Sequence, residues 1–301
     1  MNKNLLSISD LSKKDILDII EFAKNFQLED GSFRKENLFP DKTIANVFCE
    51  PSTRTKSSFE IAARNLGCSV IDFDMASSSI QKGETIFETI DALSLMGVDL
   101  CVLRHPDSVI KDLASYIPKM KFINAGEGSI SHPTQTLIDL KTIIDYKKSP
   151  DGLNIAVVGD LDHSRVTSSF VEGISHFSFN SLKFCGHPEM CSTYLNPVIG
   201  EFEPNIDIAI QNADVIMALR IQYERFAEDL NIDLEKYKSN YSLTTERLEM
   251  AKGDVIVMHP GPVNYIEISE SLYESDSSVI RQQVANSVGV RMSILSRFLS
   301  G

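Results

Sequence analysis

The sequence lacks the features that mark several classes of protein. No apolar run approaches the roughly 20 residues that a membrane-spanning helix needs, and the N-terminus, MNKNLLSISD, has no signal-peptide core. We therefore expect a cytoplasmic protein with no membrane partner. Positive charge is also scarce, since 29 Lys and Arg residues against 42 Asp and Glu residues give a net charge of −13. This balance argues against nucleic acid as a partner, and it makes every cluster of arginines informative.

Cysteine motifs and glycine fingerprints are missing as well. The five cysteines are odd in number and form no C-x-x-C pair, which fits reduced thiols rather than zinc or redox chemistry. They are Cys49, Cys68, Cys101, Cys185 and Cys191. No G-x-G-x-x-G run opens a helix, and no cluster of metal-ligand residues is present. The sequence therefore predicts neither a metal nor a cofactor.

The order of apolar segments predicts an α/β fold. Short β-branched runs alternate with segments of helical periodicity, which is typical of doubly wound, mainly parallel sheets. The expected strands are 43–48, 69–73, 99–104, 121–124, 154–159, 181–185, 214–219 and 254–258. The expected helices are 5–26, capped by Ser9 or Asp10, then 55–66, 84–96, 107–116, 133–147, 165–177, 188–195, a long helical region 222–251, and 277–299.

The length of 301 residues favours two domains. The polar, breaker-rich stretch 147–152 is the expected boundary between them. We therefore expect two tandem doubly wound domains, 1–147 and 148–276, with the active site between them.

One stretch, Cys49–Glu60, organises the functional interpretation. Its sequence, CEPSTRTKSSFE, lies where a buried strand ends and a helix begins, so backbone N–H groups and the helix dipole there favour an anion. Three hydroxyl groups and the planar guanidinium of Arg54 add donors that suit a phosphate. A plain Ser/Thr helix cap beside a solvated arginine is the alternative interpretation of this stretch.

Polar residues also follow the other expected strands. In open α/β sheets, ligands bind beyond the carboxyl ends of the strands. The residues at these ends include Arg54, Arg104, His132, Gln135, Arg165, Arg220 and Gln222. Each has an ordinary alternative: His132 can be a capping histidine and Arg104 an ion-pair partner, while His105 and His163 are expected to be turn residues. Their shared position at one rim of the sheets favours a common site.

Two loops add to this rim. The loop Asp74–Gly83 is long and rich in serine, so it is either a flexible tip or a mobile segment that brings Ser78, Ser79 and Lys82 to an anion. The segment Pro260-Gly261-Pro262 has no backbone donor at either proline, and its carbonyl groups suit an amine or amide N–H. A simple strand-ending turn is the alternative for this second loop.

These motifs together carry a family resemblance. In chain order, PSTRT, SSSIQKGET, LRHP, NAGEG…HPTQT, GDL…R, LR-I-Q-Y-E-R and HPGPVN resemble the catalytic chains of aspartate carbamoyltransferases. The resemblance extends from about residue 5 to the last helix. It implies transfer of the carbamoyl group of carbamoyl phosphate to L-aspartate, an early step of pyrimidine (UMP) biosynthesis. An ornithine-specific relative is expected to show an HCLP-like segment where this chain has HPGP.

The resemblance also implies a role for each residue of the site. Carbamoyl phosphate would be bound by Ser52, Thr53, Arg54, Thr55, Ser78, Lys82, Arg104, His132, Gln135, Gly261 and Pro262. Arg54, Thr55, Arg104 and His132 would be the catalytic residues among them. Aspartate would be bound by Lys82, Arg165, Arg220 and Gln222. The resemblance further implies a cis peptide bond before Pro262 and a C-terminal helix, in 277–301, that packs back on the first domain.

The family pattern implies a homotrimer with shared active sites, in which Ser78 and Lys82 come from a neighbouring subunit. It also leaves room for a regulatory chain or a dihydroorotase as a partner. Two positions depart from the pattern: Lys56 stands where relatives often have arginine, and Tyr265 stands near another frequent arginine. The remaining alternatives are a carbamoyltransferase for another amino acid, such as ornithine, and a non-catalytic paralogue that binds anions or scaffolds a partner enzyme.

Overall fold

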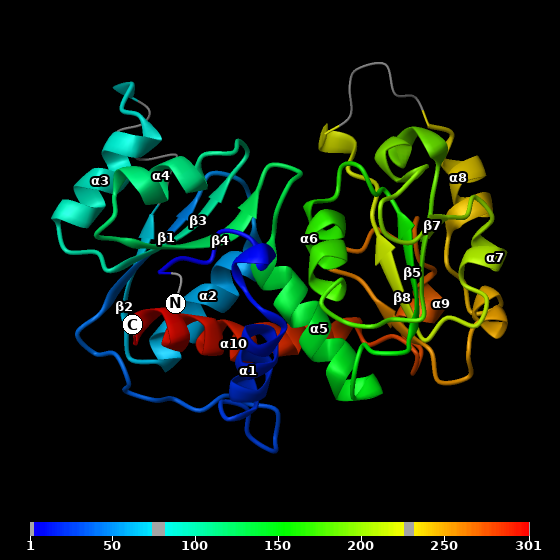
Figure 1. The fold of residues 1–301 in the computed structure, drawn as a ribbon, viewed down its shortest axis with the longest axis horizontal. Coiled ribbons are helices and arrows are strands. Elements are labelled where there is room, and N and C mark those ends of the chain that lie inside the picture. The colour runs from blue at the N-terminus through cyan, green and yellow to red at the C-terminus, as the bar shows by residue number, and fades with distance from the viewer. Residues whose placement is uncertain (1–2, 74–81, 226–231, 301) are drawn as a thin grey trace. The chain divides into compact units, whose positions relative to one another are not determined.

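A computed structural model describes residues 3–73, 82–225 and 232–300 of the chain. The chain divides into two compact units, each with its own parallel sheet (Figure 1). Unit 1 comprises Met1–Ile138 and Ala285–Gly301, and unit 2 comprises Asp139–Val284. The division falls within two helices, α5 (Pro133–Lys147) and α10 (Ile280–Leu299). Most of the serine-rich loop at 74–83, including Ser78 and Ser79, lies outside the described residues.

Unit 1 is built on a four-stranded parallel sheet in the order β2-β1-β3-β4. Its strands are β1 (Thr43–Phe48), β2 (Ser69–Phe73), β3 (Leu100–His105) and β4 (Lys121–Glu127). Alternate residues of β1, such as Ala45 and Val47, enter a core shared with α3 (Ile86–Leu95) and α4 (Ile110–Tyr116). That core covers one face of the sheet.

The helices α1 (Lys13–Lys24), α2 (Thr53–Asn65) and α10 pack together within unit 1. Arg291 of α10 is fully buried, donates to the Ser58 hydroxyl at 2.5 Å, and lies with its guanidinium carbon 4.7 Å from the centre of the Phe59 ring. The Ser293 hydroxyl donates to the Ile19 carbonyl at 2.7 Å. From Ala285 onward, the last helix of the chain is therefore an integral part of the first unit.

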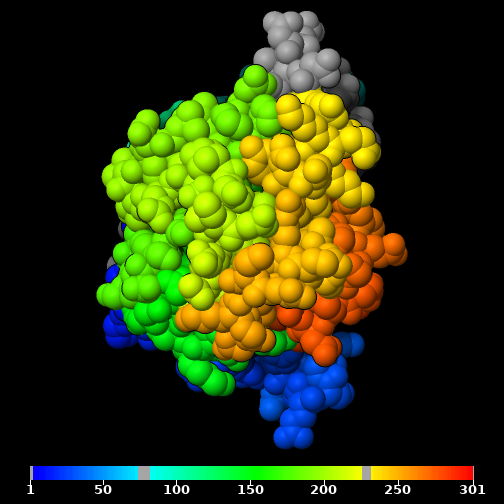
Figure 2. All heavy atoms as spheres, turned by 90° about the vertical axis from the view of Figure 1, so that its right-hand side faces the viewer, coloured from blue at the N-terminus to red at the C-terminus, as the bar shows by residue number. Residues whose placement is uncertain are grey.

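Unit 2 is built on a five-stranded parallel sheet in the order β7-β6-β5-β8-β9. Its strands are β5 (Asn154–Gly159), β6 (Ser181–Cys185), β7 (Glu201–Phe202), β8 (Val215–Leu219) and β9 (Ile256–Met258), and its further helices are α6 (Arg165–Ile174), α7 (Ile206–Ala209), α8 (Leu234–Tyr241) and α9 (Glu270–Tyr273). In the space-filling view, the green segments before β8 and the yellow and orange segments after residue 232 form one continuous face (Figure 2). The ion pair between Arg247 and Asp207, at 3.1 Å, joins these two parts of the unit.

The predicted architecture of two parallel-sheet α/β units is confirmed, but three predicted helices are wrong in detail. In place of one helix over 5–26, a short 3-10 turn precedes α1, which begins after Ser12 with a Ser12/Asp15 capping box. In place of a helix over 188–195 there are two 3-10 turns, because the Asp162 carboxylate binds the N–H groups of Ser192 and Thr193 at 2.6 and 3.1 Å.

The region 222–251 holds only one described α-helix, α8, together with two 3-10 turns at 223–225 and 247–250. The guanidinium of Arg247 donates to the carbonyls of Ser239 and Ser242, at 2.7 and 2.5 Å, and so satisfies carbonyl groups at the end of α8. Of the helices that the structure describes, none is long and apolar enough to span a bilayer.

Candidate active site

Each sheet has one position where the chain switches direction across it, and the expected site residues follow the strands at these positions. In unit 1, β1 lies between β2 and β3, and Phe48 of β1 is in register with Arg104 of β3. The Cys49 N–H donates to the Arg104 carbonyl at 2.9 Å, so the two strand ends remain joined beyond the ladder. Ligands of open parallel sheets bind at such switch points. This pairing brings the segment after β1 next to the segment after β3.

The start of α2 has no side-chain cap among the residues that the structure describes. Ser52 occupies the N-cap, yet among the described residues its hydroxyl caps no N–H group of the helix. The first turn, Thr53–Lys56, contains no acidic residue. By contrast, α1 and α3 each begin with a capping box that combines a hydroxyl with a carboxylate. A helix start without a cap or a carboxylate of its own is a feature that a phosphate would satisfy.

Arg104 is fixed against this helix start. Its Nη1 donates to the Ser52 hydroxyl at 3.1 Å, and its Nε contacts the Glu50 carboxylate at 3.1 Å. The Arg104 side chain is only 17% exposed, whereas Arg54 on the first turn of α2 is exposed. Thus the structure brings together Ser52, Thr53, Arg54, Thr55 and Arg104 around one helix end. Thr55 is the buried member of this group.

His132 and Gln135 lie at the start of α5, which follows β4. Both side chains are buried, and the Gln135 N–H donates to the His132 carbonyl at 3.0 Å, so the two residues share the first turn. The end of β4 is joined to the end of β3 because the Gly128 N–H donates to the His105 carbonyl at 3.0 Å. His105 is the last residue of β3, and its Nδ1 accepts from the Asp107 N–H at 2.9 Å in the bend that follows the strand.

Unit 2 repeats this arrangement at the junction of β5 and β8. Gly159 of β5 is in register with Leu219 of β8, and its φ of +127° lies in the region that favours glycine. A Cβ atom on Gly159 would lie 2.1 Å from the Leu219 carbonyl oxygen. This close approach places the residues after β5, which lead to Arg165, beside those after β8, which begin with Arg220.

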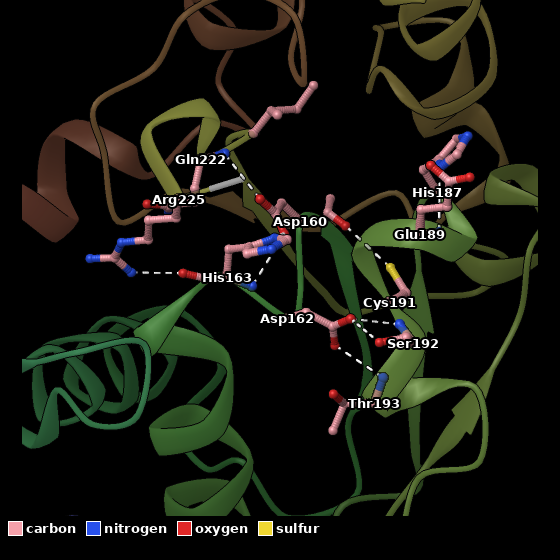
Figure 3. A network of polar contacts seen from close by, with 12 residues as sticks. Asp160, Asp162, His163, His187, Glu189, Cys191, Ser192, Thr193, Gln222 and Arg225 are labelled. Atoms are coloured by element: carbon pink, nitrogen blue, oxygen red, sulfur yellow. Dashed lines mark hydrogen bonds and ion pairs between the residues drawn. The ribbon is translucent and has the colours of Figure 1, made fainter. Parts of the chain in front are cut away.

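Asp160 ties these two segments together (Figure 3). One carboxylate oxygen accepts from His163 Nδ1 at 2.8 Å, and the other accepts from the Gln222 N–H at 3.0 Å. Arg225 donates to the His163 carbonyl at 2.7 Å and adds a second link. Burial raises the pKa of Asp160, and the hydrogen bonds from Gln222 and His163 oppose that rise. Neither Asp160 nor Arg225 is predicted as a site residue from the sequence.

The expected aspartate-binding residues lie around the hydrogen bonds of Asp160. Arg165 is buried at the first position of α6, whose N-cap Ser164 makes no capping bond among the described residues. Arg220 contacts the Glu224 carboxylate, with Nη1 at 3.1 Å from Oε2, and also reaches Gln222 Oε1 at 3.4 Å. The hydrogen bond from Arg220 lowers the pKa of Glu224. Arg220 thus already has the geometry of a carboxylate receptor.

The remaining predicted residues lie elsewhere. The Gly261–Pro262 peptide bond is cis, as expected, and Gly261 has a φ of +73°. These two residues stand on the loop after β9 in unit 2. Lys82 is exposed and follows the undescribed part of its loop, whereas Ser78 lies outside the described residues. Among the side chains that the structure describes, no group of three or more His, Cys, Asp and Glu residues is arranged to hold a metal ion.

Both departures from the family pattern have local partners. Lys56 Nζ contacts the Asp72 carboxylate at 2.7 Å, so its charge serves an ion pair between α2 and β2. The Tyr265 ring packs edge-on against Tyr273, with ring centres 5.9 Å apart. Neither residue is a direct member of the groups described above.

Comparisons with known proteins agree on one family. The family model for the aspartate/ornithine carbamoyltransferase carbamoyl-P binding domain matches residues 3–145, and the model for the Asp/Orn binding domain matches residues 151–298. The chain is 39% identical to the aspartate carbamoyltransferase catalytic subunit of Streptococcus gordonii, over 99% of this chain and 96% of the relative. It is 40% identical to that of Desulforapulum autotrophicum, over 97% of this chain and 94% of the relative.

Solved structures give the same result. Aspartate transcarbamoylase from Trypanosoma cruzi in complex with carbamoyl phosphate and aspartate is 29% identical, with a TM-score of 0.86 and coverage of 97% of this chain and 95% of that one. The same enzyme in complex with N-(phosphonacetyl)-L-aspartic acid is 29% identical, with a TM-score of 0.83 and coverage of 97% and 94%.

Proposed function

Because the chain belongs to the aspartate/ornithine carbamoyltransferase family, we propose that it transfers the carbamoyl group of carbamoyl phosphate to the amine of L-aspartate. The products are N-carbamoyl-L-aspartate and phosphate, in an early step of pyrimidine biosynthesis. One observation carries the proposal: in a chain of net charge −13, arginines gather at the switch point of each sheet. Both substrates are multiply anionic, so this is the distribution that the reaction requires.

Carbamoyl phosphate is assigned to the helix start in unit 1. The N–H groups of α2, the hydroxyls of Ser52, Thr53 and Thr55, and the guanidinium of Arg54 would hold the phosphate. Arg104 would reach both the phosphate and the carbonyl oxygen, since its bond to Ser52 fixes it at this helix end.

The carbamoyl group itself is assigned to a second set of donors and acceptors. Thr55, Arg104 and His132 would stabilise the oxyanion that forms on the carbonyl oxygen when the amine attacks. The carbamoyl NH2 would be oriented by Gln135 and by the carbonyls of Gly261 and Pro262.

Aspartate is assigned to the cations of unit 2. Arg165, Arg220 and Gln222 would bind its two carboxylates, and Asp160 would hold their segments in register. Because Glu224 is bound to Arg220, a substrate carboxylate would displace an internal one. Two guanidinium groups suit aspartate and disfavour the cationic side chain of ornithine.

The chemistry is direct transfer to the amine. No covalent nucleophile is needed, and burial raises the pKa of Cys49, the cysteine nearest the phosphate segment in sequence, to about 11, so it remains a thiol at neutral pH. His132 would act mainly as a hydrogen-bond donor, and the leaving phosphate would accept the proton of the attacking amine.

We also propose two domains, 1–147 and 148–276, with the helix in 277–301 belonging to the first. The chain would form a homotrimer in which Ser78 and Lys82 of one subunit complete the site of the next, and a regulatory or dihydroorotase chain could be a partner. Cytoplasmic localisation is in keeping with the five free cysteines.

A turnover assay tests the proposal. Purified protein of measured oligomeric mass is incubated with carbamoyl phosphate and either L-aspartate or ornithine, and phosphate release and carbamoylated product are both quantified. We expect carbamoylation of aspartate and none of ornithine. Ornithine turnover without aspartate turnover would identify another carbamoyltransferase, and binding of carbamoyl phosphate without either product would identify a non-catalytic paralogue.

A further inference from the structure

A buried histidine–carboxylate pair lies at the base of the loop that follows β9. The side chains of His259 and Glu267 are 0% and 1% exposed, and His259 Nε2 lies 2.8 Å from Glu267 Oε1. Neither residue belongs to the groups assigned above to the two substrates. Between them runs the segment Pro260–Pro262, called here the acceptor segment, which carries the carbonyls assigned to the carbamoyl NH2.

The hydrogen bonds determine the protonation of His259. The Gly261 N–H donates to His259 Nδ1 at 2.7 Å, so Nδ1 must carry a lone pair. The ring proton is therefore assigned to Nε2, from which it is donated to Glu267. His259 thus acts as a neutral bridge: it accepts the Gly261 N–H at Nδ1 and donates from Nε2 to the Glu267 carboxylate.

Both ends of the loop are fixed by further contacts within unit 2. The His259 N–H donates to Gln283 Oε1 at 2.9 Å, and Gln283 Nε2 donates to the Asp139 carboxylate at 2.6 Å. At the other end, the Asn264 N–H donates to Glu267 Oε1 at 3.3 Å. The same carboxylate oxygen therefore holds the histidine and the far side of the loop.

The direction of the Gly261 N–H determines the direction of its neighbours. A peptide unit is planar, so the bond to His259 fixes the plane that contains the Gly261 nitrogen and the Pro260 carbonyl. The φ of Gly261, +73°, is accessible to glycine, and together with ψ it relates this plane to the next peptide plane. Proline offers no N–H at either side of Gly261, so this single donor is the only backbone N–H of the acceptor segment.

Burying a polar pair is an energetically unfavourable way to stabilise a loop. Burial of a carboxylate carries a desolvation cost that apolar packing avoids, and apolar replacements of buried pairs are often neutral or stabilising. What the pair supplies is orientation, because hydrogen bonds are directional and apolar contacts are not. The pair is therefore better suited to orienting the carbonyl groups than to stabilising unit 2.

We propose that His259 and Glu267 are positioning residues that aim the acceptor-segment carbonyls at the carbamoyl NH2 of the substrate. The inference rests on the proposed function and deepens it. It predicts that the pair controls recognition of the amide group while leaving recognition of the phosphate group unchanged.

Two substitutions separate the halves of the bridge. In His259→Asn, the amide oxygen can take the place of Nδ1 and accept from the Gly261 N–H, but the side chain is too short to reach Glu267. In His259→Gln, the amide nitrogen can reach Glu267, but the Gly261 N–H loses its acceptor. Glu267→Gln keeps the shape of the carboxylate and removes its charge, and it serves as the second variant if His259→Gln does not fold.

Asp214→Asn provides a matched control from the same unit. Asp214 is also buried and accepts a backbone N–H, that of Asn154, at 2.8 Å. Its other partner is Lys252, at 2.7 Å. It precedes β8, at the amino ends of the strands, opposite the edge where β9 leads into the acceptor segment. Loss of this carboxylate should lower stability without changing ligand selectivity.

The probes are inorganic phosphate, which has no amide, and phosphonoacetamide, which carries both a phosphonate and an amide. Each inhibition constant is measured in the turnover assay with full-length protein. We expect His259→Gln to lower kcat by about 100-fold, as a misplaced reacting group does. The inhibition constant of phosphonoacetamide should rise at least tenfold, while that of phosphate should change less than twofold. His259→Asn should retain most of the selectivity, and Glu267→Gln should show a smaller loss of the same kind.

Equal weakening of both probes in His259→Gln, or no weakening of either, would overturn the inference. So would the same selective loss in Asp214→Asn. If the unsubstituted protein itself fails to carbamoylate aspartate, the proposed function fails first. Turnover in that protein together with unchanged selectivity in the variants overturns only the positioning role.

Discussion

The close approach of β5 to β8 makes Gly159→Ala a sharp test of how the second half of the site is built. Gly159 has a φ of +127°, and a Cβ atom there would lie 2.1 Å from the Leu219 carbonyl oxygen and 2.9 Å from its carbon. Both obstructing atoms belong to backbone within the sheet, so neither can rotate away as a flexible side chain could. The strand ends must separate.

The cost has two parts. A non-glycine residue in this backbone region costs about 1–3 kcal/mol, and forcing extra volume into a packed site costs a further 1–3 kcal/mol or so. We therefore expect the free energy of unfolding of unit 2 to fall by about 2–6 kcal/mol. Arg220 follows Leu219 directly, so the displaced strand end should also raise the KM for aspartate. Inhibition by phosphate, assigned to unit 1, should remain unchanged.

Gly152→Ala is the matched control. Gly152 also has a positive φ, +77°, but no atom of the described residues lies within 4 Å of the position that a Cβ atom would take, so only the backbone cost applies. Denaturant unfolding and steady-state kinetics of the two variants isolate the effect of the close approach. Equal losses of stability in both variants, with an unchanged KM for aspartate, would refute the reasoning.

Two further predictions concern the charged groups of the site. Arg54→Ala should lower kcat/KM by on the order of 100-fold, about 3 kcal/mol, because a donor to the leaving phosphate is lost; near-normal turnover would contradict that role. Asp160 has a folded-state pKa raised above its ordinary 3.8, so the folded chain binds its proton more tightly than the unfolded chain. As pH falls through the raised pKa toward 3.8, protonation of Asp160 should increase the free energy of unfolding. Denaturant midpoints compared between about pH 6 and pH 4 should show this gain in the unsubstituted protein and lose it in Asp160→Asn. An unchanged pH dependence in the variant would contradict the burial of the carboxylate.

The sequence predicts much of the site because the rule that locates it is local. Each expected cation follows a buried strand, and both strand and cation can be recognised within a few residues, as at Phe48 and Arg54. The two sheets and the helix starts at α2 and α6 follow from the same periodicity. Once the strands pair in parallel, their carboxyl ends lie at the same edge of the sheet, so the residues that follow them lie close together.

What the sequence could not predict depends on contacts between distant residues. Asp160 acquires its role because β5 pairs with β8, which places its carboxylate 3.0 Å from the N–H of Gln222. The helix expected over 188–195 fails because Asp162, far earlier in the chain, binds the N–H groups of Ser192 and Thr193. The periodicity of a segment does not show whether a distant carboxylate will bind its N–H groups in the folded protein.

The division of the chain also sets an order in which the molecule can be completed during synthesis. Unit 2 is one uninterrupted stretch, Asp139–Val284, whereas unit 1 needs the residues from Ala285 onward. Arg291 and Ser293, which contact α2 and α1, are therefore translated after every residue of unit 2. The part of the protein that emerges first from the ribosome is the part that is finished last, and until then the surfaces of α1 and α2 that receive α10 are without their covering helix.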